Sequence, residues 1–242
     1  MGRKEAMIAN VVRSVMFFAT ARYAKALGLA YVTRDQNLTI ALQADGSAKV
    51  SDKLTYISYQ ADTFHHTLQL LDYDVSQLSV SLLDPITQSK QPVMLSDTNE
   101  PLSYQLIEVR EEYQRLQIFY EAKHENVTFY YDYVIDNFVT NYADGAELIA
   151  LRAQDGIIQE DADFTGTILL PALTQEEVMV QLLNVGDQAQ VVVGREEETV
   201  IRVGIPADAM TNETILYIQV AAELFPKNPN SFLEFSLKKE GE

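Results

Sequence analysis

The sequence of 242 residues contains no cysteine and no tryptophan, and only three of its residues are histidines. Without cysteine, the chain can form no disulfide bond, no thiolate zinc site and no cysteine nucleophile. It also has no uninterrupted apolar run of about 18 residues, so no clear membrane-spanning segment is visible. The hydrophobic content of 47% and the charged content of 22% are ordinary for a globular protein, which excludes disorder of the whole chain.

Positive charge is scarce and unevenly distributed. The chain has 18 Lys and Arg residues against 35 Asp and Glu residues, which gives a formal net charge of −17. Residues 1–34 contain six basic residues and one acidic residue, whereas the remaining 208 residues contain 12 basic and 34 acidic ones. A body this acidic repels phosphate, which argues strongly against nucleic-acid binding.

The basic segment, residues 1–34, has two interpretations that the sequence leaves open. In the first it is a degenerate export signal or anchor, because a short apolar run over 14–21 ends in the small-x-small pattern Ala19-Thr-Ala21. Arg13 and Arg22 shorten that run. In the second it is a basic helix that packs on the body or lies on a membrane surface, because its apolar residues also fit helical spacing.

From residue 36 the apolar residues recur with a period of two. Leu38, Ile40 and Leu42 alternate with polar or small residues, and Asp45-Gly46 then provides a hairpin turn. The pattern predicts a return strand over 48–58 and further strands over 65–71, 77–83, 91–96, 103–108 and 115–122.

A second series of strands begins at residue 127. Five apolar residues share one face of its first strand, which we predict to be central: Val127, Phe129, Tyr131, Tyr133 and Ile135. Further strands are predicted over 163–170, 177–185, 188–193, 197–204 and 213–221. This density of short strands is typical of β-sandwiches. We therefore predict an all-β fold of two packed antiparallel, Ig-like sandwich lobes, 35–123 and 124–226, preceded by an N-terminal helix and followed by a tail, 227–242. No linker marks the seam, so the lobes should pack rigidly or share a sheet.

Few residues suggest chemistry. His65 and His66 are adjacent on a predicted strand and so point to opposite faces, which disfavours a shared metal ion. Asp144 and Glu147 could act as an acid–base pair of the glycosidase kind, but we interpret them as parts of a turn. The tyrosines of 129–133 could stack on sugar rings, although core packing is their commoner role. We expect no catalytic residue, metal or cofactor.

Several stretches together resemble a known family. They are the strand–turn–strand segment 38–56, the stretch 127–148, the strand end Ile168-Leu-Leu-Pro171 and the stretch 218–226. The chain resembles the extracytoplasmic N-terminal domain of bacterial predicted membrane proteins known as domain of unknown function 2207 over about residues 36–226. The positions that match the family pattern, which we interpret as structural, are Asp45, Gly46, Tyr133, Asn137, Asp144, Glu147, Leu148, Pro171 and Pro226. A Trp soon after Glu147-Leu148, an Arg after the first hairpin and downstream membrane helices are the family features missing here.

The resemblance implies a location and a fold but no reaction. We therefore expect a non-enzymatic extracytoplasmic domain, membrane-associated or secreted, that binds or scaffolds an unknown protein or ligand at the bacterial surface. Membrane association could use residues 1–34 or helices beyond the chain. One alternative is a carbohydrate-active or carbohydrate-binding protein that uses Asp144, Glu147, Tyr131 and Tyr133. The other is a soluble intracellular binding domain.

Overall fold

The computed structural model describes most of the chain between residues 30 and 225. The described residues are 30–69, 75–110, 113–122, 125–136, 138–141, 146–152, 162–171, 178–195, 199–211, 213–221 and 225. Residues 1–29, which hold most of the predicted N-terminal helix, and the tail 227–242 lie outside them. Residues 31–34, assigned to that helix, instead begin the first strand, because residues 31–33 pair with residues 56–58 of the return strand.

Nearly all of the described chain is β-structure. The strands are β1 (Tyr31–Leu42), β2 (Ala48–Ser58), β3 (Ala61–Gln69), β4 (Val75–Leu83), β5 (Lys90–Leu95), β6 (Ser103–Arg110), β7 (Tyr113–Ala122), β8 (Asn126–Ile135), β9 (Thr140–Asn141), β10 (Ala146–Arg152), β11 (Asp163–Leu169), β12 (Met179–Leu183), β13 (Gln190–Arg195), β14 (Thr199–Ile205) and β15 (Ile215–Ala221), with one short 3-10 helix, η2 (Ala207–Ala209). The all-β prediction is confirmed, and most strands begin and end within a few residues of their predicted bounds.

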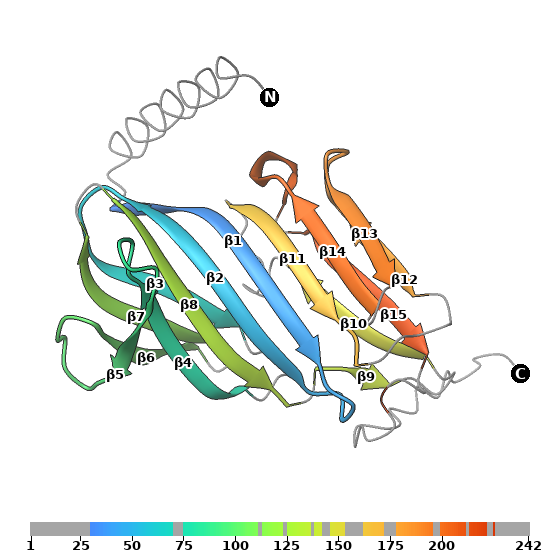
Figure 1. Ribbon diagram of the computed structural model, residues 1–242, viewed down its shortest axis with the longest axis horizontal. Coiled ribbons are helices and arrows are strands. Elements are labelled where there is room, and N and C mark those ends of the chain that lie inside the picture. The colour runs from blue at the N-terminus through green and yellow to red at the C-terminus, as the bar shows by residue number, and fades with distance from the viewer. Residues whose placement is uncertain are drawn as a thin grey trace, which may run out of the picture.

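The strands form one large sheet and one small sheet (Figure 1). The large sheet has 11 strands in the order β13-β14-β11-β1-β2-β8-β4-β5-β6-β7-β3, and the small sheet has four in the order β12-β15-β10-β9. Two neighbouring pairs, β1 with β11 and β5 with β6, are parallel. The expectation of purely antiparallel sheets was therefore wrong, because both pairs join strands that are not connected by a hairpin.

The large sheet carries strands from both predicted lobes. β8, which begins just after residue 124, lies between β2 and β4 and is central, as predicted. β11 lies beside β1. Strands that precede and follow residue 124 thus share a sheet. This is one of the two arrangements expected from the lack of a linker. The division into two domains stays a prediction.

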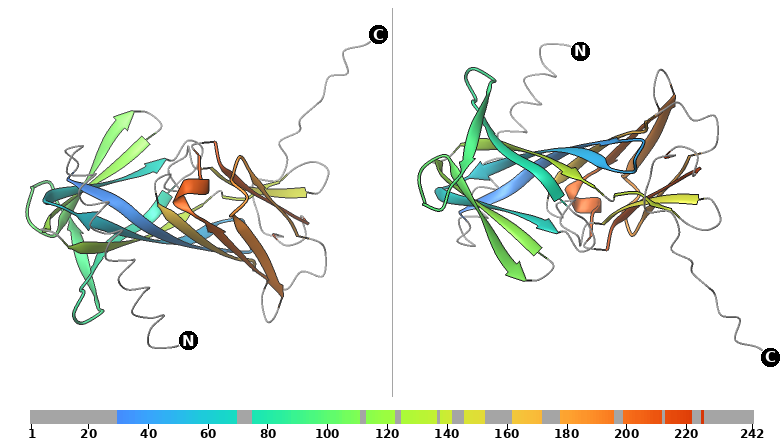
Figure 2. Two further views of the ribbon diagram at one scale, coloured as in Figure 1. Left: turned by 90° about the horizontal axis from the view of Figure 1, so that it is seen from above. Right: turned by 90° about the horizontal axis from the view of Figure 1, so that it is seen from below.

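The inner face of the large sheet is covered at both of its ends (Figure 2). At one end the sheet folds back, so that Phe64 of β3 packs on Tyr56 of β2 and on Phe129 of β8, with both ring-centroid distances at 5.4 Å. At the other end the small sheet supplies Leu216 and Ile218, which belong to the same core cluster. One continuous hydrophobic core therefore lies between the large sheet and the strands that cover it.

Strand alternation explains why only one face of the large sheet is packed. In β8 the odd-numbered residues 127–135 are buried, and the even-numbered residues between them are half-buried or, at the strand start, exposed. The same alternation leaves Asn37 and Thr39 of β1 exposed between buried residues. Figure 1 is viewed onto this second face, which no described strand covers. Within the described part of the chain, no helix has the length and apolar character needed to cross a membrane.

Candidate functional site

The first hairpin turn forms as the sequence predicted. Gly46 has φ of 80°, a left-handed conformation that favours glycine. Asp45 Oδ1 accepts hydrogen bonds from the backbone N–H and the hydroxyl of Ser47, at 3.0 and 2.7 Å. The carbonyl of Gly46 accepts a bond from the N–H of Val139 at 3.0 Å, which ties the turn to the chain after β8. Both family-pattern residues therefore shape the backbone.

The other family-pattern residues are dispersed. Tyr133 is buried in β8, and Pro171 is half-buried just after β11. In β10, Glu147 pairs with Val220 and Leu148 pairs with Gln219, so Glu147 lies in a strand and not in the predicted turn. Three further family-pattern residues lie outside the described residues, and they are Asn137, Asp144 and Pro226. The structure thus gathers no site from this set.

The proposed sugar-stacking tyrosines point into the core. Tyr131 is 0% exposed and Tyr133 is 5% exposed. Because alternation directs odd-numbered residues of β8 inward, neither ring can stack on a sugar that approaches from solvent. The carbohydrate alternative in that form was wrong. Tyr130, which precedes Tyr131 in β8, points outward instead.

A buried polar cluster, which the sequence analysis missed, lies between the sheet layers. It consists of Gln36 of β1, Asp52 of β2 and His66 of β3, all nearly inaccessible to solvent. The side-chain amide of Gln36 donates to Asp52 Oδ2 at 2.9 Å, and His66 Nε2 lies 3.8 Å from the same oxygen. The His66 ring packs on Tyr131, with a centroid distance of 4.2 Å. The sequence does contain one signal for this cluster, because Asp52 lies on the same face of its strand as the inward residues Val50 and Leu54.

Burial controls protonation in this cluster. It raises the pKa of Asp52 from 3.8 to about 7, although the hydrogen bond from Gln36 favours the charged carboxylate. Burial lowers the pKa of His66 from 6.5 to about 3. Among the described residues, Asp52 Oδ1 and both ring nitrogens of His66 find no hydrogen-bond partner. Between pH values of about 3 and about 7 the pair is therefore an enclosed, protonated Asp52 carboxyl beside a neutral His66 imidazole.

His65 and His66 face different surroundings, as alternation predicted. His66 is in the core, whereas the backbone N–H of His65 donates to the hydroxyl of Tyr31 at 2.9 Å. No group of three or more metal-ligating side chains occurs in the part of the chain that the structure describes. The two histidines thus form no common site.

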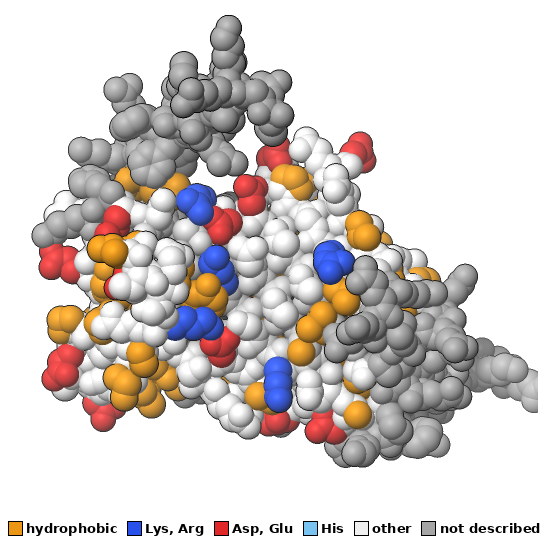
Figure 3. All heavy atoms as spheres, viewed as in Figure 1, with side chains coloured by type: hydrophobic (Ala, Val, Ile, Leu, Met, Phe, Trp, Pro, Cys, Tyr) orange, Lys and Arg blue, Asp and Glu red, His pale blue; other side chains and the backbone are white. Residues whose placement is uncertain are grey.

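The uncovered side of the large sheet, here called the outer face, is the second candidate site (Figure 3). It is made of the outward side chains of β14, β11, β1, β2 and β8, together with Lys90 at the start of β5. Its basic residues are Arg34, Lys49, Lys53, Lys90 and Arg202, and its uncharged polar residues include Asn37, Thr39, Ser51, Thr128, Thr165 and Thr167. These five are all of the basic residues whose side chains the structure describes.

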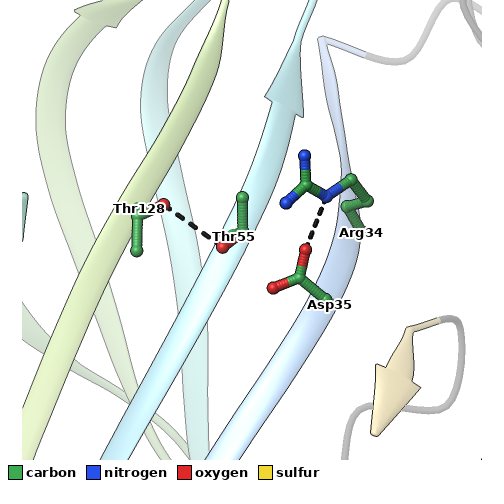
Figure 4. A network of polar contacts seen from close by, with 4 residues as sticks. All are labelled: Arg34, Asp35, Thr55 and Thr128. Atoms are coloured by element: carbon green, nitrogen blue, oxygen red, sulfur yellow. Dashed lines mark hydrogen bonds and ion pairs between the residues drawn. The ribbon is translucent and has the colours of Figure 1, made fainter. Parts of the chain in front are cut away.

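Local contacts hold some of these side chains in place. Lys90 Nζ lies 3.9 Å from the ring centroid of Tyr130 and 3.2 Å from Asp132 Oδ2, and Lys53 Nζ lies 5.9 Å from the same ring. Arg34 pairs with its neighbour Asp35 at a bulge in β1 (Figure 4). The outer face thus combines cations, hydroxyl groups and one aromatic ring.

The sequence matches one family model. The match is to "Predicted membrane protein (DUF2207) N-terminal domain" and covers residues 34–215. The chain therefore belongs to the DUF2207 family, as its resemblance to that family implied. No curated protein matches the chain.

Solved structures show distant likenesses. A candidate nutrient binding protein from Legionella pneumophila matches with a TM-score of 0.49 and 9% identity, over 78% of this chain and 67% of the other. An M1 zinc metallopeptidase from Deinococcus radiodurans matches with a TM-score of 0.44 and 11% identity, over 78% of this chain and 42% of the other. This chain thus spans less than half the length of that peptidase. Likenesses this remote carry no argument about function.

Proposed function

We propose that this DUF2207 domain is a non-enzymatic, extracytoplasmic module of a bacterial envelope protein that binds or scaffolds a component at the cell surface. One observation carries the proposal. The large sheet is packed on its inner face, yet no described strand covers its outer face, which presents polar side chains across at least five strands. A face this wide, with hydrogen-bonding groups on adjacent strands, is suited to binding an extended partner.

The protonation chemistry of the core supports a non-enzymatic role. Asp52 and His66 form the close acid–imidazole pair of the described chain, at 3.8 Å. Their side chains are each 1% exposed, so a substrate would have no access to them. General acid–base catalysis needs groups within hydrogen-bond reach of a substrate. We therefore interpret the pair as part of the fold.

The two-lobe description remains part of the proposal. One lobe would be the end at which β3 packs on β2 and β8, and the other would be the end that the small sheet covers. Both would share the large sheet, so the outer face would run continuously across them. A binding surface that spans both lobes would then be rigid.

Membrane topology tests the proposed location. Residues 1–242 would be fused at residue 242 to alkaline phosphatase and, separately, to a cytoplasm-active fluorescent protein. We expect phosphatase activity and no fluorescence, because residues 1–34 would then direct the acidic body outward. A deletion of residues 1–29 is the matched control and should reverse both signals. A body that remains in the cytoplasm with the N-terminus intact would refute the location and favour the intracellular alternative.

A further inference from the structure

We infer that the outer face binds an acidic polysaccharide, a polymer of sugars that carry carboxylates. This inference rests on the proposed surface-binding function and adds the class of ligand.

The charge of the outer face is the first observation that supports the inference. Although the chain carries a net charge of −17, every basic side chain that the structure describes lies on this one face. Since salt screens exposed charges beyond about 8 Å at physiological ionic strength, the local sign matters more than the net charge.

Three of these cations are available to a ligand. Among the described residues, Arg34 pairs with Asp35 and Lys90 pairs with Asp132. Asp163, the remaining acid of the face, accepts a hydrogen bond from the backbone of Ala207 at 3.1 Å.

Lys49, Lys53 and Arg202, by contrast, form no ion pair with any residue that the structure describes. A ligand anion therefore has positive charge to neutralise at three positions.

The spacing of these three cations selects an extended ligand. Lys49 and Lys53 are four residues apart on β2, which corresponds to about 13 Å along the strand. Arg202 lies on β14, three strands away from β2, which corresponds to about 14 Å across the sheet. A single small anion cannot contact two groups at such separations. A polymer with repeated negative charges can contact all three.

The residues between the cations favour a sugar polymer. The strand register aligns Arg202, Thr167, Thr39, Ser51 and Asp132 in one row across five strands. The threonines of this row offer hydroxyl groups to sugar hydroxyls, with the cation Arg202 at one end. At the other end, Asp132 accepts a hydrogen bond from the hydroxyl of Ser51 and pairs with Lys90, so its charge is locally balanced.

Other macromolecules fit the outer face less well. The cores of protein interfaces are enriched in aromatic residues and methionine and depleted in lysine and serine, whereas this face carries three lysines, Ser51 and one aromatic ring, Tyr130. A bilayer surface is flat, whereas the large sheet is visibly twisted (Figure 2). A flexible polymer can follow a twisted row of side chains. The observations therefore favour the polysaccharide over a protein or a membrane.

Binding of the purified full chain to polygalacturonate, measured by titration calorimetry, tests the inference. The test variant is K49Q/K53Q/R202Q. The control variant Q60E/N99D/Q181E changes the net charge by the same amount at exposed residues off the outer face. Because each exposed ion pair contributes modestly, we expect the test variant to bind roughly 10- to 100-fold more weakly and the control to differ less than about threefold. Affinity should also fall as NaCl rises from about 50 to about 300 mM.

The outcomes separate the possibilities. Equal weakening of both variants would show that only net charge matters and would overturn the assignment, as would no binding at low salt. Equal binding to neutral dextran would overturn the acidic specificity. Binding to phosphatidylglycerol vesicles without binding to the polymer would identify a membrane surface instead. Unfolding midpoints in urea verify that each variant is folded. Failure of these experiments leaves the topology result unaffected, so the two proposals fail separately.

Discussion

The buried pair of Asp52 and His66 predicts an unusual pH dependence of stability. In the folded protein, between pH values of about 3 and about 7, the Asp52 carboxyl is protonated and His66 is a neutral imidazole, so the pair binds one titratable proton. In the unfolded chain, between their ordinary pKa values of 3.8 and 6.5, Asp52 is ionised and His66 is protonated. Both states therefore bind one proton at this pair. Because stability varies with pH only when the two states bind different numbers of protons, the pair contributes almost no slope between pH 4 and 6.5.

Single substitutions of Asp52 and His66 should make the free energy of unfolding depend on pH in opposite directions. In D52N, His66 remains neutral in the folded state but becomes protonated in the unfolded state, so stability is lost as the pH falls through 6.5. In H66F, Asp52 remains protonated in the folded state but ionises in the unfolded state above its ordinary pKa of 3.8. Stability is then lost as the pH rises towards 7. Each proton difference contributes about 1.4 kcal/mol per pH unit, which becomes about 2 kcal/mol between pH 4.5 and 6.5 once partial titration is included.

Urea unfolding at pH 4.5, 5.5 and 6.5 measures these slopes. The wild-type curve is subtracted at each pH, which removes the contribution of the other acidic groups. Relative to wild type, D52N should lose about 2 kcal/mol on going from pH 6.5 to 4.5, and H66F should lose about the same in the opposite direction. The double variant D52N/H66F is the control and should follow the wild-type slope. Single variants that also follow the wild-type slope would refute the assigned protonation states.

The remaining predictions concern the packing of the sheets and use the same urea assay at one pH. G46A should lose about 1 kcal/mol, because φ of 80° is strained for a residue with a Cβ, whereas G204A should change little, because its Cβ would meet no atom within 4 Å. G166A should lose about 1 to 3 kcal/mol, because the new Cβ would lie 2.9 Å from the buried ring of Phe164. F64A should lose about 3 to 5 kcal/mol, because the Phe64 ring is fully buried where β3 crosses the large sheet. Losses no larger than that of G204A would contradict each expectation.

The strands were predictable from the sequence because their signal is local. Alternation of apolar residues located β2, β8 and the second half of β1, and the Asp45-Gly46 turn fixed the hairpin of β1 and β2. β10 was missed, because the Glu-Leu-rich stretch that follows Asp144-Gly145 has no clear period of two. The sheet order was not predictable either, since the pairing of β1 with β11 joins residues more than 120 positions apart.

The candidate sites were harder to predict than the strands. Asp52 lies on the buried side of β2, but a charged residue at such a position does not fit the alternation of apolar residues that marks a core face. Its partner His66 lies on another strand, so only the fold brings the two within 3.8 Å. The outer face could not be predicted because its residues lie on separate strands. Nothing in the sequence distinguishes Lys49 and Lys53 from other charged residues, and only strand pairing places Arg202 on the same face as these two.

The two faces of the large sheet should be separable by experiment, because alternation directs their side chains in opposite directions. Exposed substitutions usually change stability by less than about 0.5 kcal/mol, so K49Q/K53Q/R202Q should retain the pH slope of the wild type while losing the polymer. D52N at pH 6.5 should remain folded and bind the polymer as the wild type does, because Asp52 is 1% exposed and no ligand on the outer face can contact it. If loss of binding and loss of stability instead occurred together in both variants, the binding surface would have to depend on the core, and the assignment of separate roles to the two faces would be wrong.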